Sequence, residues 1–229
     1  MNRREELAAN LHDVQQAIAS ECAALGRELP VLIVVTKTKP TSDMELLGEL
    51  GVTDVGENRD QEAKVKHEEC TAKFVWHAIG QLQTNKAKSV ATWADVVHSV
   101  DRPDLVSALA KATRERTVPL KCLIQVNLDP DAPEHRGGCL PVDVMALAQQ
   151  IAECPTLELK GVMGVGPLGQ DPNPAFETLF EVSQSLQTVH PQATWISAGM
   201  SDDYPIALKH GATHLRIGST ILGSRAVVG

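Results

Sequence analysis

The sequence has no dense run of lysine or arginine, and its 21 basic residues are outnumbered by 29 acidic ones. A formal net charge of −8 makes the chain a poor ligand for a phosphate backbone, so we exclude nucleic acid as its main partner. No stretch is long and apolar enough to span a bilayer, and no apolar signal region follows the N-terminal residues 1–6. These absences predict a cytoplasmic protein without a membrane partner.

Paired cysteines are also missing. The five cysteines are scattered, odd in number and never arranged as C-x-x-C, which is not typical of a disulfide framework or a zinc site. The histidines, including His210 and His214, do not show the H-E-x-x-H spacing of a metal site. We therefore predict reduced packing cysteines and no bound metal.

Apolar periodicity predicts an α/β protein that begins with a helix. Near the N-terminus, apolar residues recur every three or four positions, which indicates one amphipathic helix. They are Leu7, Leu11, Val14, Ile18, Cys22 and Leu25. Strands are then expected near 31–36, 53–56, 74–79, 95–98, 121–127, 158–163, 194–197 and 213–217. Helices are expected near 42–50, 59–69, 84–92, 103–114, 141–153, 173–189, 202–210 and 219–224.

This alternation of strands and helices predicts a (β/α)₈ TIM barrel with an extra N-terminal helix, formed by residues 1–229 as a single domain. An open doubly wound sheet is the alternative fold, because the same alternation produces it. No G-x-G-x-x-G motif follows the first expected strand, which weighs against a dinucleotide-binding version of that alternative.

Lys37 follows the apolar run 31–35. A strand this hydrophobic is normally buried on both faces of a parallel sheet, so we expect a lysine at its carboxyl end to be poorly solvated. Poor solvation favours the neutral amine, which can form an imine with an aldehyde. The nearby Lys39 is the alternative imine former, but Pro40 ends the strand there, and we interpret Lys39 as a solvated loop lysine.

Other polar and glycine residues also collect at the carboxyl ends of the expected strands, where barrels carry their chemistry. Besides Lys37, the candidate site residues are Asn58, His77, Met163, Ser197, Gly199, Met200, Ser201, Arg216, Gly218 and Ser219. Because the strands of a parallel barrel all end at one rim, we predict that these residues share a site.

Two turns that combine glycine with hydroxyl groups follow the last two strands, at 197–201 and 218–220. Hydroxyls and close-approaching backbone N–H groups bind phosphate dianions, and barrels often place a phosphate site in these two loops. The alternative interpretation is ordinary helix N-capping by Ser201 and Ser219.

An imine-forming lysine and a phosphate site together fit pyridoxal 5′-phosphate (PLP). Arg216 beside the pyridine nitrogen would leave that nitrogen unprotonated, which disfavours transamination.

Several longer motifs extend this interpretation. They are residues 36–40, 56–62, 76–86, 98–101, 199–203 and 216–219. With these motifs in this order, the chain resembles the pyridoxal phosphate homeostasis proteins (YggS/PROSC-like), also called alanine racemase N-terminal-domain proteins.

The resemblance implies a PLP-binding barrel of fold type III, with PLP held as an imine on Lys37 and its phosphate in the two glycine–hydroxyl turns. It also implies a role in vitamin B6 homeostasis, in which the protein buffers PLP or supplies it to apo-enzymes without catalytic turnover. Asn58 has an amide suited to the phenolic oxygen of PLP, or it is a helix cap. His77 contacts the cofactor or is a core histidine with its hydrogen bonds satisfied.

An amino-acid racemase is the main alternative function. Racemisation needs two acid–base groups on either side of the imine, and the barrel racemases that this chain resembles take the second from a tyrosine in another domain. The sequence ends at Gly229 and has a single tyrosine, Tyr204, expected on a helix, so we predict binding without turnover. A lysine-imine aldolase without a cofactor is the other alternative. The acidic composition, without an obvious apolar patch, favours a monomer.

Overall fold

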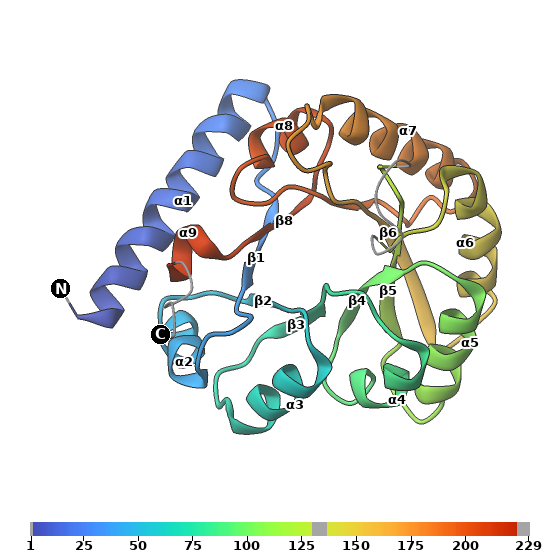
Figure 1. Cartoon of the computed structure of the whole chain (residues 1–229), viewed down its shortest axis with the longest axis horizontal. Helices are drawn as coiled ribbons and strands as arrows, with labels where there is room; N and C mark the ends of the chain where they lie inside the picture. Colours follow the sequence, from blue (N-terminus) through green and yellow to red (C-terminus); the bar gives the residue numbers. More distant parts are fainter. Residues whose placement is uncertain (1, 130–136, 224–229) are drawn as a thin grey trace.

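The structure, a computed structural model, describes residues 2–129 and 137–223. Its strands form a closed parallel barrel in the order β1-β2-β3-β4-β5-β6-β7-β8, and β8 pairs with β1. The helices lie around the outside of this barrel (Figure 1). Closure confirms the predicted (β/α)₈ architecture and excludes the open doubly wound sheet.

The strands lie close to the predicted positions. They are β1 (Val31–Val35), β2 (Asp54–Glu57), β3 (Val75–Ala78), β4 (Val96–Val100), β5 (Leu120–Gln125), β6 (Leu157–Met163), β7 (Trp195–Ser197) and β8 (His214–Ile217). The α-helices are α1 (Arg3–Leu25), α2 (Thr41–Glu49), α3 (Asp60–Glu69), α4 (Ala87–Val90), α5 (Pro103–Ala112), α6 (Val144–Ala152), α7 (Asn173–Val189), α8 (Tyr204–Lys209) and α9 (Ser219–Leu222). Short 3₁₀ turns, η1 (Thr84–Lys86) and η2 (Pro141–Asp143), precede α4 and α6.

Several expected helices differ from the observed ones by two or more residues at an end, among them the last two. The helix expected near 202–210 begins at Tyr204, because the preceding residues form a turn in which the Met200 N–H donates to the Asp203 carboxylate at 2.6 Å. The helix expected over 219–224 ends at Leu222, with Gly223 at its C-cap. Residue 224 lies outside the described residues.

Helix α1 is the predicted extra helix, and it packs along the side of the barrel (Figure 1). A capping box between Asn2 and Glu5 begins it, and Gly26 ends it in the left-handed conformation. Its predicted apolar stripe is buried except for Leu25, which is partly buried. Side chains of α1 also reach α9, where Arg3 donates to the carbonyl of Leu222 at 3.1 Å and Asn10 to that of Ile221 at 2.9 Å. Helix α1 therefore fixes the short helix that follows β8.

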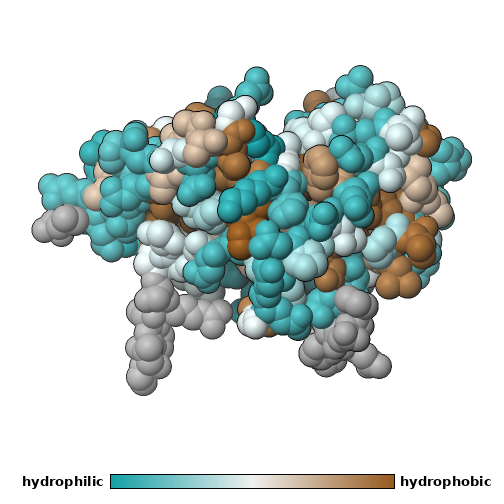
Figure 2. Space-filling model, turned by 90° about the horizontal axis from the view of Figure 1, so that it is seen from above, coloured by the Kyte–Doolittle hydropathy of each residue, from teal (hydrophilic) through white to brown (hydrophobic). Residues whose placement is uncertain are grey.

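The states of the cysteines and the polarity of the surface agree with what the composition predicts. All five cysteines are free thiols, and each is buried or partly buried, which confirms the packing role. The face seen in Figure 2 is mainly hydrophilic, and its hydrophobic residues form small separate patches. Within residues 2–129 and 137–223, we find no helix with the length and apolar character needed to cross a membrane.

Candidate functional site

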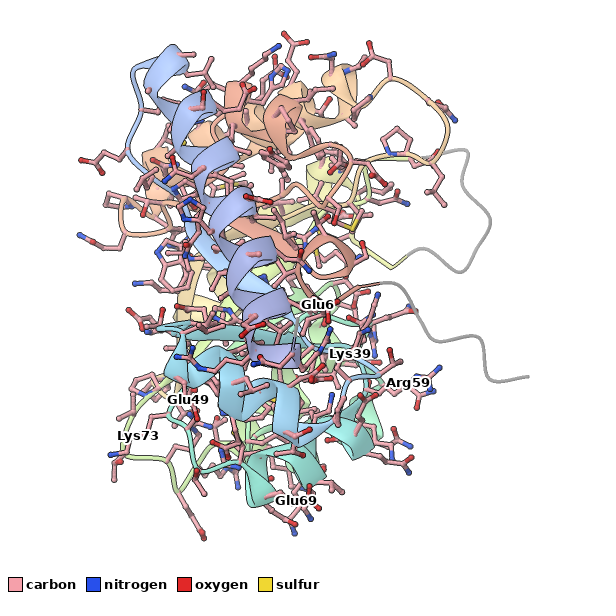
Figure 3. The ribbon with its side chains drawn as sticks, turned by 90° about the vertical axis from the view of Figure 1, so that its left-hand side faces the viewer. Glu6, Lys39, Glu49, Arg59, Glu69 and Lys73 are labelled. Carbon is pink, nitrogen blue, oxygen red and sulfur yellow. The ribbon has the colours of Figure 1, made fainter. Side chains whose placement is uncertain are left out.

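The loops that follow the strands meet at one end of the barrel. Figure 3 shows Lys39, from the turn after β1, and Arg59, from the loop after β2, at the same end of the molecule. Glu49 and Lys73, which precede strands, lie at the opposite end. This arrangement is the single rim that the sequence predicts for a parallel barrel.

A cavity of about 530 Å³ opens at this rim, and most of the predicted site residues line it. They are Lys37, Asn58, Met200, Ser201, Arg216, Gly218 and Ser219. The wall also contains Thr38, Lys39 and Asp202. The structure therefore brings a lysine amine, an arginine and two serine hydroxyls together around one space, from segments that are far apart in the sequence.

Lys37 is exposed, so the expectation that it is poorly solvated is wrong. Strand β1 ends at Val35, and Thr36 takes the last buried position, where its N–H donates to the carbonyl of Gly56 at 3.0 Å. The chain then turns, with Thr38 at a φ of 64°. The amine of Lys37 consequently belongs to a solvent-accessible turn at the cavity mouth.

A buried ion-pair network lies under this turn, and sequence reasoning missed it. Lys66 is 5% exposed, and its Nζ contacts Glu57 Oε1 at 2.7 Å and Glu62 Oε1 at 2.6 Å. Glu57 is 1% exposed, and burial raises the pKa of its carboxyl group while the hydrogen bonds from Lys66 and Thr36 oppose that rise. The spacing of Glu62 and Lys66, four residues apart on α3, is the signal that predicts part of this network.

The network contacts the turn on both sides of Lys37. The hydroxyl of Thr36 donates to Glu57 Oε1 at 2.7 Å, and Lys66 Nζ donates to the Thr36 carbonyl at 2.8 Å. The backbone N–H of Thr38 donates to the Glu62 carboxylate. Because its two neighbours are held in this way, the backbone of Lys37 is fixed while its side chain remains free to reach the cavity.

The serine turns close the cavity from the side of β7 and β8. Ser201 Oγ and Ser219 Oγ lie 3.3 Å apart, although they come from different loops. Gly199 has a φ of 92°, and a Cβ there would lie 2.9 Å from the Cβ of Ala207, so this turn requires glycine. A Cβ at Gly218 would lie 2.9 Å from the carbonyl oxygen of Val35, which shows how closely the second turn approaches the end of β1.

Arg216 lines the cavity although it is only 5% exposed. Its Nη1 donates to Ser197 Oγ at 2.7 Å, and its Nη2 donates to the carbonyl of Gly164 at 2.8 Å. Burial lowers the pKa of its guanidinium to about 10, against an opposing effect of Asp203. Arg216 therefore stays positively charged at neutral pH.

The other predicted site residues, His77, Met163, Ser197 and Gly199, do not line the cavity. All are buried, and the three side chains among them have other partners. His77 lies in the barrel interior, hydrogen-bonded to Asp54 and His98; Met163 packs against Val96 and Leu123. Ser197 lies behind Arg216. His77, Met163 and Ser197 lie on strands beneath the cavity, and Gly199 shapes the turn that carries Ser201, so none of the four forms part of the cavity wall as expected.

The closed parallel barrel and its rim cavity correspond to a known class of protein. The family described as "Alanine racemase, N-terminal domain" matches residues 4–226. A pyridoxal phosphate homeostasis protein of Corynebacterium glutamicum is 42% identical over 201 residues, which cover 85% of this chain and 90% of the relative. The chain thus belongs to the family of pyridoxal phosphate homeostasis proteins, as its motifs predict.

Solved structures agree with this assignment. PipY of Synechococcus elongatus, solved with PLP bound, is 32% identical with a TM-score of 0.78, and the match covers 90% of this chain and 100% of PipY. An alanine racemase of Corynebacterium glutamicum shares the fold alone. It is 12% identical with a TM-score of 0.74, over 99% of this chain and 62% of the racemase.

Replacing Lys66 tests the buried network. Lys66→Met would leave the carboxylate of Glu57 buried without its cation, so we expect the free energy of unfolding to fall by about 3–5 kcal/mol. Urea denaturation measures this change. Lys64→Met is the matched control on the same helix. Lys64 is exposed, and its ion pair with Glu68 is long, at 3.9 Å, so its loss should change the free energy of unfolding by less than about 0.5 kcal/mol. Equal losses in the two variants would contradict a stabilising role for the network.

The lowered pKa values of two buried histidines predict how the free energy of unfolding depends on pH. Burial lowers the pKa of His98 well below its usual range and lowers that of His214 to about 3. Between pH 6.5 and 5 the unfolded chain therefore takes up protons that the folded chain does not. We expect the free energy of unfolding to decrease by up to about 1.4 kcal/mol per pH unit for each histidine.

Urea denaturation at pH 7, 6 and 5 measures this slope. His214→Gln should make the slope shallower by the contribution of one histidine. His12→Gln, on the exposed face of α1, should leave it unchanged. A stability that stays constant between pH 7 and 5 would contradict the prediction.

Proposed function

We propose that this protein binds PLP in the rim cavity as a Schiff base on Lys37, and that it buffers or supplies the cofactor in vitamin B6 homeostasis without catalytic turnover. The observation that carries the proposal is the cavity itself, whose wall combines the amine of Lys37, the guanidinium of Arg216 and the hydroxyls of Ser201 and Ser219. PLP has an aldehyde, a ring nitrogen and a phosphate, and these groups fit that donor set.

Each group of the cavity has a role in the proposal. Ser201 and Ser219 donate hydrogen bonds to the phosphate, and their separation of 3.3 Å allows both to reach one anion. Arg216, which cannot give up its proton at neutral pH, donates to the pyridine nitrogen and keeps it unprotonated. Bound PLP would supply a reactive aldehyde, and this arginine weakens the ring as an electron sink. Asn58 lies at the wall, and its amide would donate to the phenolic oxygen.

The cavity wall favours a carrier over a racemase. A racemase needs a second acid–base group opposite the lysine. Besides Lys37, the acid–base side chains among the described residues of the cavity wall are Lys39, from the same turn as Lys37, and Asp202. The wall contains no tyrosine or histidine among those residues, and the single tyrosine of the sequence, Tyr204, lies on α8 outside it. The exposure of Lys37 also suits release, since an acceptor can reach a group bound to its amine from solvent.

The related proteins support the same role. The Corynebacterium relative is named for pyridoxal phosphate homeostasis, and PipY has been solved with PLP bound. We further propose that PLP-dependent apo-enzymes receive the cofactor in the cytoplasm and that the protein acts as a monomer.

Replacing the lysine tests the proposed attachment. The protein incubated with PLP should be yellow, and borohydride should fix the mass of the cofactor on the peptide that contains Lys37. Lys37→Ala should lose this labelling, whereas Lys39→Ala, two residues away in the same cavity wall, should retain it. Mass spectrometry of the digested protein measures both.

Three outcomes would overturn parts of the proposal. Labelling that survives Lys37→Ala would show that another lysine is the attachment site. A protein that stays colourless would favour the aldolase alternative. Steady racemisation of alanine or serine at enzyme-like rates would exclude a pure carrier.

The phosphate site is tested by removing the two hydroxyls. Ser201→Ala and Ser219→Ala should each weaken PLP binding roughly tenfold, because each removes a hydrogen bond to a charged group. Binding of pyridoxal, which lacks the phosphate, should not change. Ser107→Ala, exposed on α5, is the matched control. Equal losses for PLP and pyridoxal would show that these serines do not bind the phosphate.

A further inference from the structure

A continuous row of polar side chains, partly exposed at its first member and buried along the rest, crosses the interior of the barrel and ends at the cavity arginine. Asp54 Oδ1 lies 2.9 Å from His77 Nε2, and His77 Nδ1 lies 2.8 Å from His98 Nε2. His98 Nδ1 lies 2.9 Å from Ser197 Oγ, which accepts from Arg216 Nη1 at 2.7 Å. The row begins at the first residue of β2, at the end of the barrel opposite to the cavity.

The two ends of this row determine the direction of its hydrogen bonds. A carboxylate only accepts, so Asp54 requires the proton of His77 to be on Nε2. When the ring of His77 carries this single proton, its Nδ1 must accept from the N–H of His98 Nε2. The neutral ring of His98 then accepts at Nδ1 from the hydroxyl of Ser197. Ser197 in turn accepts from Arg216, which only donates.

The charges of the two end groups agree with this order. Burial alone would raise the pKa of Asp54, but the hydrogen bonds from His77 and Thr53 lower it below its usual value. Asp54 is thus ionised at neutral pH. Burial keeps His98 neutral, since it lowers the pKa of that ring. The row therefore has a negative charge at one end, a positive charge at the other, and every donor between them pointing toward the carboxylate.

Arg216 has no carboxylate in direct contact. In the described part of the chain Asp203 raises its pKa without forming an ion pair with it, and the two hydrogen-bond acceptors of the guanidinium, Ser197 and the carbonyl of Gly164, are neutral. A buried cation without a counter-charge is costly. Hydrogen bonds in a row polarise one another in a low-dielectric interior, so the charge of Asp54 strengthens the acceptor that Ser197 offers to Arg216.

We propose that Asp54 is the remote counter-charge of Arg216, and that His77, His98 and Ser197 are positioning residues that couple the two across the barrel. The row holds the guanidinium at the cavity floor in one orientation, with its remaining N–H groups directed to the ligand. Where it concerns binding of PLP, this inference rests on the proposed function.

The protonation pattern of the ligand-free protein tests the row directly. Side-chain ¹⁵N chemical shifts at pH 7 should show both His77 and His98 as neutral rings with the proton on Nε2. Asp54→Ala should remove this preference in His77 and disturb His98. A proton on Nδ1 of either ring, or a charged His98, in the unmodified protein would overturn the proposal. This measurement does not require PLP, so it remains decisive if the proposed function is wrong.

A double-mutant cycle tests whether the row acts on the ligand. Asp54→Ala and Ser197→Ala should each weaken PLP binding roughly tenfold. The double variant should bind no more weakly than Ser197→Ala alone, because the loss of Ser197 already disconnects Asp54 from the arginine. Losses that multiply in the double variant would show that the two residues act separately and would overturn the coupling.

Two matched controls separate coupling from general destabilisation. Asp95→Ala removes a carboxylate from the same end of the barrel, where it accepts from the backbone N–H of Trp76 at 2.9 Å. Ser99→Ala removes a buried hydroxyl next to His98 that has no hydrogen-bond partner among the described residues. Both should leave PLP affinity within about twofold of the unmodified protein. If either weakens binding as much as Ser197→Ala does, the effect comes from stability and the proposal fails.

Discussion

The pairing of β8 with β1 is the interaction on which the rest of the structure depends. Ile33 lies beside Arg216 and Val34 beside Ile217 in this register, so the last strand is held next to the first. This closure brings the turn that contains Lys37 next to the loops that contain Ser201 and Ser219. Helix α1 reinforces the arrangement through its hydrogen bonds to α9. The cavity is therefore a product of barrel closure more than of any single loop.

Closure also creates a physical problem, because it buries charged groups that need partners. The structure solves it in two separate ways. Under the Lys37 turn, Lys66 lies between two carboxylates and forms a compact ion-pair network. Inside the barrel, the acceptors of Arg216 among the described residues are neutral, and a row of hydrogen bonds leads to Asp54. The first network fixes a backbone and leaves a flexible lysine exposed, whereas the second fixes a side chain and keeps it buried.

These two arrangements suit a protein that holds a reactive aldehyde and gives it up again. In the proposed function, an attachment lysine in solvent would allow exchange, while the arginine and the paired serines would keep the ligand in one orientation. The racemase of the same fold that was compared shares only 12% of its sequence with this chain, although its TM-score is 0.74. The barrel alone therefore does not decide between a carrier and an enzyme. That distinction depends on the residues of the cavity wall.

The amino-acid sequence by itself determined the order of the strands and helices, the extra helix and the position of the rim. Those features follow from local apolar periodicity and from the rule that parallel strands end on one side. It also indicated Lys37, Ser201, Arg216 and Ser219 as neighbours. Only the tertiary structure decided that Lys37 is exposed, because the end of β1 depends on how Thr36 packs against β2.

The same limit explains why His77 and Ser197 were expected at the cavity and lie beneath it. Whether an inward-facing side chain of a strand reaches the rim or a layer below it depends on the stagger between neighbouring strands, which the sequence does not show. The acceptors of Arg216, and the Thr36 carbonyl that accepts from Lys66, likewise come from other segments of the chain. Burial makes those partners necessary, but only the folded barrel selects which residues they are.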